Sequence, residues 1–203
     1  MSGQSNEGGT VVDEVARRLP VIGVMGSGAA SIGVALERRA ASVGDLVARM
    51  GCHLLTGGGA GVMAAAARGF VAVDGRRGLS IGVLPGSPPA ARVGPPHPPP
   101  GYPNAWIELP IRTHLPWSGG DGIDPLSRNH LNVLSSDALV ALDGGAGTAS
   151  EITLALRYTR PVVAFLENPE RELLLRPKDV PLVKTLAEVE AFVRARFHDP
   201  PLP

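Results

Sequence analysis

Three short apolar runs in this chain each end in a glycine-rich turn that leads into a helix-forming stretch. The turns are Gly26-Ser27-Gly28, Gly57-Gly58-Gly59-Ala60-Gly61 and Gly144-Gly145-Ala146-Gly147-Thr148. Apolar, β-branched runs that alternate with longer helical stretches are typical of a parallel sheet covered by helices on both faces. The predicted fold class is therefore α/β, with a doubly wound, mostly parallel sheet in three layers.

The expected elements follow this alternation. Strands are predicted over residues 21–25, 52–56, 79–84, 105–113, 138–142 and 161–166, and helices over 34–50, 61–70, 125–135 and a stretch ending near residue 158. A last helix is expected after Thr185, because Thr185 and Glu188 have the spacing of a capping box. The alanines that follow Met63 predict a small-residue helix face that packs tightly against the sheet or a second copy of the chain.

A chain of 203 residues has the length of one domain. Residues 1–15 are expected to form a disordered tail, and residues 16–203 a single Rossmann-like nucleotide-binding domain. Nine prolines fall within residues 85–103. Such a segment lacks backbone donors, so it is predicted to be a loop, acting either as a passive connector or as the rim or lid of a pocket.

Composition excludes several mechanisms. The 19 basic and 19 acidic residues balance, which disfavours a nucleic-acid partner. The two lysines, Lys178 and Lys184, follow no glycine turn, which excludes a Walker lysine and argues against a pyridoxal-phosphate Schiff base. The single cysteine, Cys52, and the scattered histidines predict no metal site and no disulfide framework. With no signal peptide and no apolar stretch of membrane length, the expected location is the cytoplasm.

The glycine turns are the predicted phosphate site. Glycine lets the backbone approach a ligand closely, and the helix that follows presents unpaired N–H groups and the positive end of its dipole. Glycines also serve tight packing of a helix on a strand, and the first turn lacks the third glycine of a dinucleotide fingerprint. The predicted ligand-binding residues are Gly26, Ser27, Gly28, Gly57, Gly58, Gly59, Gly61, Val62, Met63, Arg128, Asn129, Gly144, Gly145, Gly147 and Thr148.

Thr148 and Glu151 have two interpretations. A Thr-x-x-Glu pair at a helix start is the pattern of a capping box, which would account for both residues. Alternatively, the Glu151 carboxylate stands one turn above a phosphate-binding helix end, where it could polarise water or stabilise positive charge developing on a sugar carbon.

Three motifs carry a family resemblance: GGGAGVM at 57–63, SRN at 127–129 and GGAGTASE at 144–151. Together they resemble the Lonely Guy superfamily, and more closely its branch of molybdenum-cofactor carrier proteins. The resemblance implies a phosphate-bearing ligand and a homo-oligomer, dimer or tetramer. In the superfamily's phosphoribohydrolases, Arg128 would match the catalytic arginine and Glu151 the catalytic glutamate. Asn129 stands where those enzymes have lysine, and Asp143 where they have proline, as in the carrier-like branch.

The leading hypothesis is a protein that binds a phosphorylated nucleotide-type ligand, as a carrier or store of molybdenum cofactor. The alternative is a phosphoribohydrolase that releases the base from a nucleoside 5′-monophosphate, with Arg128 and Glu151 as its catalytic residues. Neither hypothesis requires a catalytic cofactor; the expected bound molecule is molybdenum cofactor or a nucleoside monophosphate. A DNA-binding relative is the third class, which the balanced charge and the eight aromatic residues disfavour.

Overall fold

The computed structural model describes residues 18–86, 97–167 and 179–197. Its centre is a seven-stranded sheet in the order β4-β3-β2-β1-β5-β6-β7, in which every neighbouring pair is parallel. The strands are β1 (Val21–Met25), β2 (His53–Thr56), β3 (Ser80–Leu84), β4 (Leu109–Arg112), β5 (Ala138–Ala141), β6 (Val162–Phe165) and β7 (Leu182–Val183). The predicted α/β class with a parallel sheet is confirmed.

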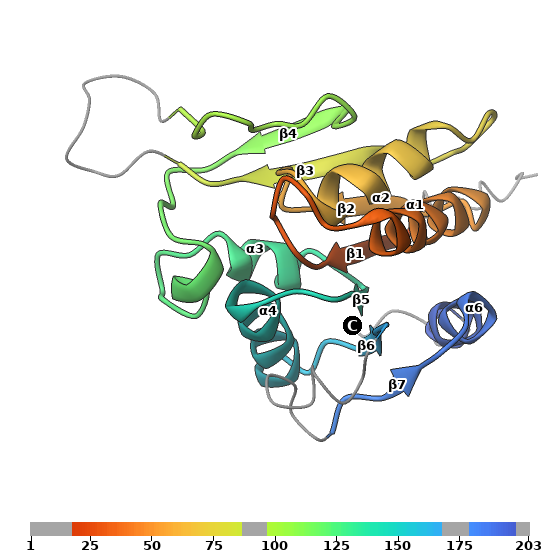
Figure 1. Cartoon of the computed structure of the whole chain (residues 1–203). Helices are drawn as coiled ribbons and strands as arrows, with labels where there is room; N and C mark the ends of the chain where they lie inside the picture. The colour runs from red at the N-terminus through yellow and green to blue at the C-terminus, as the bar shows by residue number, and fades with distance from the viewer. Residues whose placement is uncertain (1–17, 87–96, 168–178, 198–203) are drawn as a thin grey trace, which may run out of the picture.

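Helices cover both faces of the sheet, as Figure 1 shows. The helices are α1 (Val34–Arg49), α2 (Val62–Val71), the 3-10 turn η1 (Gly119–Asp121), α3 (Asn129–Leu134), α4 (Ala146–Arg157) and α6 (Leu186–Arg194). One core cluster joins α1, α2 and α6 to the sheet, and the other joins α3 and α4 to it. These two cores and the sheet between them make the three predicted layers.

The central strands are apolar because both of their faces are covered. Strands β3 and β5 are buried along their whole length, and β1 is buried from Ile22 onward. Alternate residues of β1 enter opposite cores: Ile22 and Val24 face α1 and α2, whereas Met25 belongs to the core under α3 and α4. Continuous apolar runs are the expected pattern for such strands.

The strand order reverses beside β1. From β1 the chain builds β2, β3 and β4 outward on one side, and it then returns to place β5 on the other side of β1. In open parallel sheets, ligands bind beyond the carboxyl ends of the strands at this switch point. The three glycine turns follow β2, β1 and β5, which are adjacent in the sheet, so the fold brings them to one edge.

The alanine-rich stretch of α2 packs against the sheet, as predicted, and also against α1, which was not predicted. A Cβ at Gly44 of α1 would overlap the carbonyl of Ala66, and one at Gly69 of α2 would lie 2.8 Å from the Cα of Ala41. Glycine at both positions allows the two helix backbones to approach this closely. Ala65, Ala66 and Ala67 are buried in the core that the two helices share with the sheet.

The predicted capping box of the last helix is present. Thr185 accepts a hydrogen bond from the backbone N–H of Glu188 at 3.2 Å, and the Glu188 carboxylate accepts one from the Thr185 backbone N–H at 2.9 Å.

Two expectations at the edges of the sheet were wrong. Strand β4 begins at Leu109 rather than 105, because Asn104 closes a turn onto Ile107, and the two-residue strand β7 was not predicted.

Some predictions lie outside the described residues. The expected tail at 1–15 is among these, as is the middle of the proline-rich segment, 87–96. Residues 97–103 form neither helix nor strand, as expected for a loop. Within the described ranges, no helix has the length and apolar character needed to cross a membrane.

Candidate functional site

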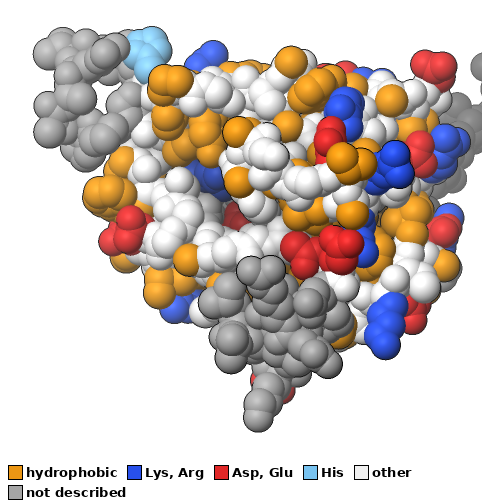
Figure 2. Space-filling view, viewed as in Figure 1, with side chains coloured by type: hydrophobic (Ala, Val, Ile, Leu, Met, Phe, Trp, Pro, Cys, Tyr) orange, Lys and Arg blue, Asp and Glu red, His pale blue; other side chains and the backbone are white. Residues whose placement is uncertain are grey.

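The three glycine turns contact one another at the switch point. The backbone N–H of Ser27, after β1, donates to the carbonyl of Asp143, after β5, at 3.0 Å. The Ser27 carbonyl in turn accepts from the N–H of Val62, at the start of α2, at 2.9 Å. Figure 2, viewed from the same side as Figure 1, shows a hollow near the centre of the visible surface. Backbone and uncharged side chains form most of its border, and a basic and an acidic side chain lie in its floor.

Some of the predicted binding residues hold the turns together. Gly61 has a φ of 66°, and a Cβ there would lie 2.7 Å from the carbonyl oxygen of Ala29. The buried Val62 packs on Gly26, where an added Cβ would lie 2.7 Å from a Val62 methyl carbon. The Met63 methyl group lies 3.3 Å from the corresponding position at Gly28. Packing therefore explains these small residues in part, and their contact with a ligand stays a prediction.

Arg128 is a buried cation at this edge. It directly precedes α3, and its guanidinium lies against the backbone of Gly57, where a Cβ would lie 2.6 Å from the Arg128 Cζ. Its Nη1 donates to Asn129 Oδ1 at 3.1 Å and lies 3.7 Å from Glu151 Oε1. Its Nε is buried and has no hydrogen-bond partner among the described residues. The guanidinium thus retains an unused donor.

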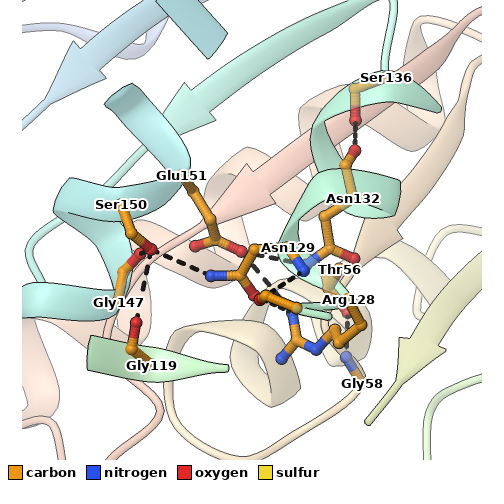
Figure 3. A network of polar contacts seen from close by, with 11 residues as sticks. Thr56, Gly58, Gly119, Arg128, Asn129, Asn132, Ser136, Gly147, Ser150 and Glu151 are labelled. Carbon is orange, nitrogen blue, oxygen red and sulfur yellow. Dashed lines mark hydrogen bonds and ion pairs between the residues drawn. The ribbon is translucent and has the colours of Figure 1, made fainter. Parts of the chain in front are cut away.

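Glu151 brings a buried acid to the same place from α4. Its side chain is only 9% exposed, and Oε1 accepts a hydrogen bond from Asn132 Nδ2 at 3.0 Å (Figure 3). Burial raises the pKa of Glu151 above its ordinary value, and the opposing effects of Arg128 and Asn132 do not cancel that rise. The arginine and the acid that the sequence predicted as catalytic residues of the hydrolase alternative lie together.

Asn129 links the two helices of this face. Its Oδ1 accepts from Arg128, and its Nδ2 donates to Ser150 Oγ at 3.1 Å. Ser150 donates onward to the carbonyl of Gly147 at 2.7 Å, within the third glycine turn (Figure 3). Both polar ends of Asn129 are therefore engaged by protein groups, and its predicted contact with a ligand stays untested.

Thr148 does not cap its helix, so the capping-box interpretation was wrong. Helix α4 begins at Ala146 with Gly145 as N-cap, and no side chain caps it. Thr148 is already inside the first turn, which leaves its hydroxyl free of the capping role. Its Oγ1 is buried without a hydrogen-bond partner in the described part of the chain, and its Cβ lies 2.8 Å from the position of a Cβ on Gly144.

The charge of Asp143 is directed away from the third turn. Its carboxylate accepts from the backbone N–H of Glu167 at 2.9 and 3.2 Å, and Arg39 lies 3.4 Å from it. The Arg39 guanidinium also lies 5.0 Å from the centre of the Phe165 ring. An acid at this position is thus neutralised locally and leaves the helix end of α4 suitable for an anion.

The end of the proline-rich segment and the residue after it lie against the second glycine turn, at the rim of the candidate site. The backbone N–H of Asn104 donates to the Gly58 carbonyl, and its Nδ2 donates to the Gly59 carbonyl, each at 2.8 Å. The ring of Tyr102 lies against Gly59, where a Cβ would lie 2.7 Å from the phenolic oxygen. Of the two interpretations of this segment, these contacts favour the rim for the residues that the structure describes.

A cavity of about 360 Å³ adjoins the turns on the α1 and α2 side. Its lining includes residues from the loop before α1, the second glycine turn and α2, with Glu37, Arg68 and Trp106 as its larger members. Glu37 and Arg68 form an ion pair at 2.7 Å. The cavity lies beside the same edge of the sheet, since Gly61 lines it and also belongs to the second glycine turn.

The described residues do not contain a cluster of three or more metal-ligating side chains. Cys52 precedes β2, at the end of the sheet opposite the glycine turns, and burial raises the pKa of its thiol to about 11.

The residues that sequence reasoning missed are Asn132 and Ser150. Asn132 follows Arg128 by four positions, the spacing that places two residues on one face of a helix, and this was the available signal.

The fold and this edge define a Rossmann-like protein with three glycine turns gathered at the switch point of its parallel sheet. A family model described as the SLOG cluster4 family matches residues 19–191, and the chain belongs to this family. An uncharacterized protein of Archaeoglobus fulgidus is 32% identical over 148 residues, which cover 73% of this chain and 81% of that protein.

Two solved structures share the fold closely. The molybdenum cofactor carrier protein of Chlamydomonas reinhardtii is 33% identical, with a TM-score of 0.68, over 90% of this chain and 100% of that one. The molybdenum cofactor binding protein of the phototrophic bacterium Rippkaea orientalis is 28% identical, with a TM-score of 0.68, over 89% of this chain and 98% of that one. These similarities agree with the family resemblance inferred from the sequence motifs.

Proposed function

We propose that the chain binds a small phosphorylated ligand of nucleotide type at the edge formed by β2, β1 and β5, and that it carries or stores molybdenum cofactor. The observation that supports this most is the Thr148 hydroxyl, which is buried without a partner in the first turn of α4. An unsatisfied buried hydroxyl costs about 1–3 kcal/mol. A ligand oxygen that hydrogen-bonds to Thr148 would remove this cost.

The donors at this edge suit a phosphate group. Helix α4 begins without a side-chain cap, so its first backbone N–H groups and its positive dipole end are available to an anion. Arg128 adds a fixed positive charge with a free Nε. These groups hold an anion without lysine, which agrees with the absence of lysine from the glycine turns.

The same residues suit molybdenum cofactor through its phosphate and heterocycle. The donors of the site described above are hydroxyl, amide, guanidinium and backbone groups, whereas the chain's one thiol, Cys52, is buried at the opposite end of β2. Recognition would therefore use the organic part of the cargo, with the adjoining cavity available to the ring system. The two structural neighbours named as binding or carrying this cofactor support the choice of cargo.

Calorimetric titration tests the proposal. Purified protein is titrated with AMP and, anaerobically, with molybdenum cofactor, and dissociation constants in the micromolar range are expected for one or both. R128Q should weaken binding about 10- to 100-fold, because it removes a charged hydrogen-bond donor. R49Q is the matched control, since Arg49 is exposed and, among the described residues, pairs with Asp45 one turn away. Affinities of both ligands no tighter than millimolar would exclude the proposal.

The phosphoribohydrolase is the second candidate, and the Arg128–Glu151 pair favours it. A buried acid with a raised pKa beside an arginine is an arrangement that could assist the departure of a base from a sugar. Chromatography of nucleoside 5′-monophosphates after incubation with the protein would detect the free base. E151Q should abolish base release with binding retained, and a wild-type protein that releases no base would eliminate this function.

We also propose a cytoplasmic homo-oligomer, a dimer or tetramer. Exposed apolar side chains gather on α3 and the segment before it, and these are Trp117, Ile123, Leu126, Leu131 and Leu134. Such a group of residues is suited to contact between copies of the chain. Light scattering coupled to size-exclusion chromatography would give the mass, and L134R should reduce it; a monomeric wild-type protein would contradict the proposal.

A further inference from the structure

Arg128 and Glu151 form an incomplete ion pair. Both side chains are less than a tenth exposed, and burial normally favours close contact between opposite charges. Their nearest nitrogen and oxygen are nevertheless 3.7 Å apart, whereas a charge-assisted hydrogen bond is about 2.7–2.9 Å long. The Arg128 Nη1 that faces Glu151 donates instead to Asn129 Oδ1 at 3.1 Å, and the Glu151 carboxylate is engaged by a different residue.

Asn132 is the group that occupies the carboxylate. Its Nδ2 lies 3.0 Å from Oε1 of Glu151, the same oxygen that faces Arg128. The carboxylate oxygen can only accept, so the amide must present its NH₂ group there. The position of Asn132 is set by the helix, since its backbone N–H donates to the Arg128 carbonyl at 3.1 Å. Figure 3 shows the three side chains converging from α3 and α4.

We infer that Asn132 is a positioning residue that holds the Glu151 carboxylate short of Arg128 and so keeps the guanidinium available for the phosphate of a ligand. This inference rests on the proposed function. In this arrangement Asn132 contacts no ligand. It acts through Glu151, which without the amide would turn toward Arg128 and compete with the phosphate for the guanidinium.

The unsatisfied Asn132 oxygen supports a role beyond stability. Oδ1 is buried and accepts no hydrogen bond from any described residue, and the residue as a whole is fully buried. A buried acceptor without a donor is unfavourable, and an apolar side chain would avoid this cost. An asparagine at this position is therefore better explained by what its NH₂ group does for Glu151.

A double-mutant cycle tests the inference with inorganic phosphate and AMP as probes. N132L should weaken binding of both by about tenfold or more near neutral pH, because Glu151 then pairs with Arg128. In N132L/E151Q the neutral amide no longer competes for the arginine, and the affinity should return to within about threefold of E151Q alone. If Asn132 had only a structural role, the binding defect of N132L would not be reversed by the E151Q substitution.

The pH dependence gives a second readout. Glu151 becomes protonated as the pH falls and then no longer pairs with Arg128, so the defect of N132L should shrink toward low pH. Besides Arg128, the charged or titratable groups on the elements around Glu151 are His130 on α3, Asp121 on η1 and Arg157 on α4. His130 is held between Tyr158 and the Asp124 carbonyl. The E151Q background separates the effect of Glu151 from that of any other group, because the N132L defect should not vary with pH in that background.

The control variant is S136A. Ser136 is buried two residues after the end of α3 and donates to the Asn132 carbonyl at 2.8 Å, but the structure shows no contact between its hydroxyl and Glu151 or Arg128. Its binding should equal that of the wild type. If N132L does not fold, N132S replaces it, because the serine hydroxyl can bond to the Arg128 carbonyl one turn back and is too short to reach Glu151.

Two results would overturn the inference: unchanged phosphate and AMP affinity in a folded Asn132 variant, or an N132L/E151Q double mutant as weak as N132L. Either can occur while the wild type binds its ligands normally. Failure of the wild type to bind AMP and molybdenum cofactor is instead the failure of the proposed function, so the two are distinguished by the wild-type titration.

Discussion

Gly57→Ala is the most direct test of the buried arginine. The position does not have a positive φ, so alanine can adopt its backbone conformation without strain. The added Cβ would lie 2.6 Å from the Arg128 Cζ, where ordinary contact is 3.4–4 Å. The guanidinium must therefore retreat by about 1 Å, a displacement that breaks the geometry of a hydrogen bond to a bound phosphate.

The expected cost has two parts. Loss of one hydrogen bond to a charged group is worth about 1.5–3 kcal/mol, which corresponds to a dissociation constant for AMP about 10- to 100-fold higher. Overpacking of the buried site should lower the free energy of unfolding by about 1–3 kcal/mol. Calorimetric titration gives the first quantity, and denaturation in urea gives the second.

Gly120→Ala is the matched control. An added Cβ there meets no atom within 4 Å, and the φ of Gly120 is not positive. Both the affinity and the stability of this variant should stay close to the wild-type values. A folded G57A protein that binds AMP as tightly as the wild type would refute the assignment of Arg128 to the phosphate.

Three further substitutions have defined outcomes. T148V should raise the free energy of unfolding by about 1 kcal/mol, because it removes an unsatisfied hydroxyl, yet weaken AMP binding about tenfold; equal binding in titrations would contradict the role of Thr148. D137N should lower the melting temperature near neutral pH. Burial raises the pKa of Asp137, but the hydrogen bonds from Arg18 and Val21 lower it by more, so the net shift of the pKa is downward. The stabilisation by the Asp137 carboxylate is therefore lost as the pH falls through the folded-state pKa. Its size is about 1 kcal/mol, reduced by the exposure of Arg18, and a difference that persisted at low pH in thermal melts would be inconsistent with this linkage. T185A should destabilise the protein by about 1 kcal/mol through the cap of α6 without changing AMP affinity, and a loss of affinity would disprove the separation of α6 from the site.

The core strands and the glycine turns were predictable because their signals are local. Strands β1 and β5 are continuous apolar runs, and a glycine turn begins within three residues of the end of each strand. The boundaries of β4 were not predictable in the same way. Residues 105–107 have the composition of a strand, but Asn104 bonds to both Gly58 and Gly59, and these contacts hold the segment as a turn.

The motifs around Arg128 and Glu151 mark two parts of the chain that the fold does bring together. The spacing of Thr148 and Glu151 nevertheless suggested a cap that the protein does not form. Local spacing shows which residues can meet on a helix, but the first residue of the helix decides whether they do, and α4 begins at Ala146. Glu151 then turns to α3, where its partners Arg128 and Asn132 come from another part of the chain.

By itself, the sequence determined the α/β class, the parallel sheet and the three turns, because hydrophobic periodicity and glycine placement act over a few residues. Only the tertiary structure shows why particular positions carry the residue types that they do. Gly57 must be small because the Arg128 guanidinium lies against it, and Thr148 and Asn132 each bury a polar atom that no described residue satisfies. The physical reason is that hydrogen-bond satisfaction and close approach depend on strand order, which brings residues distant in the sequence to one edge of the sheet.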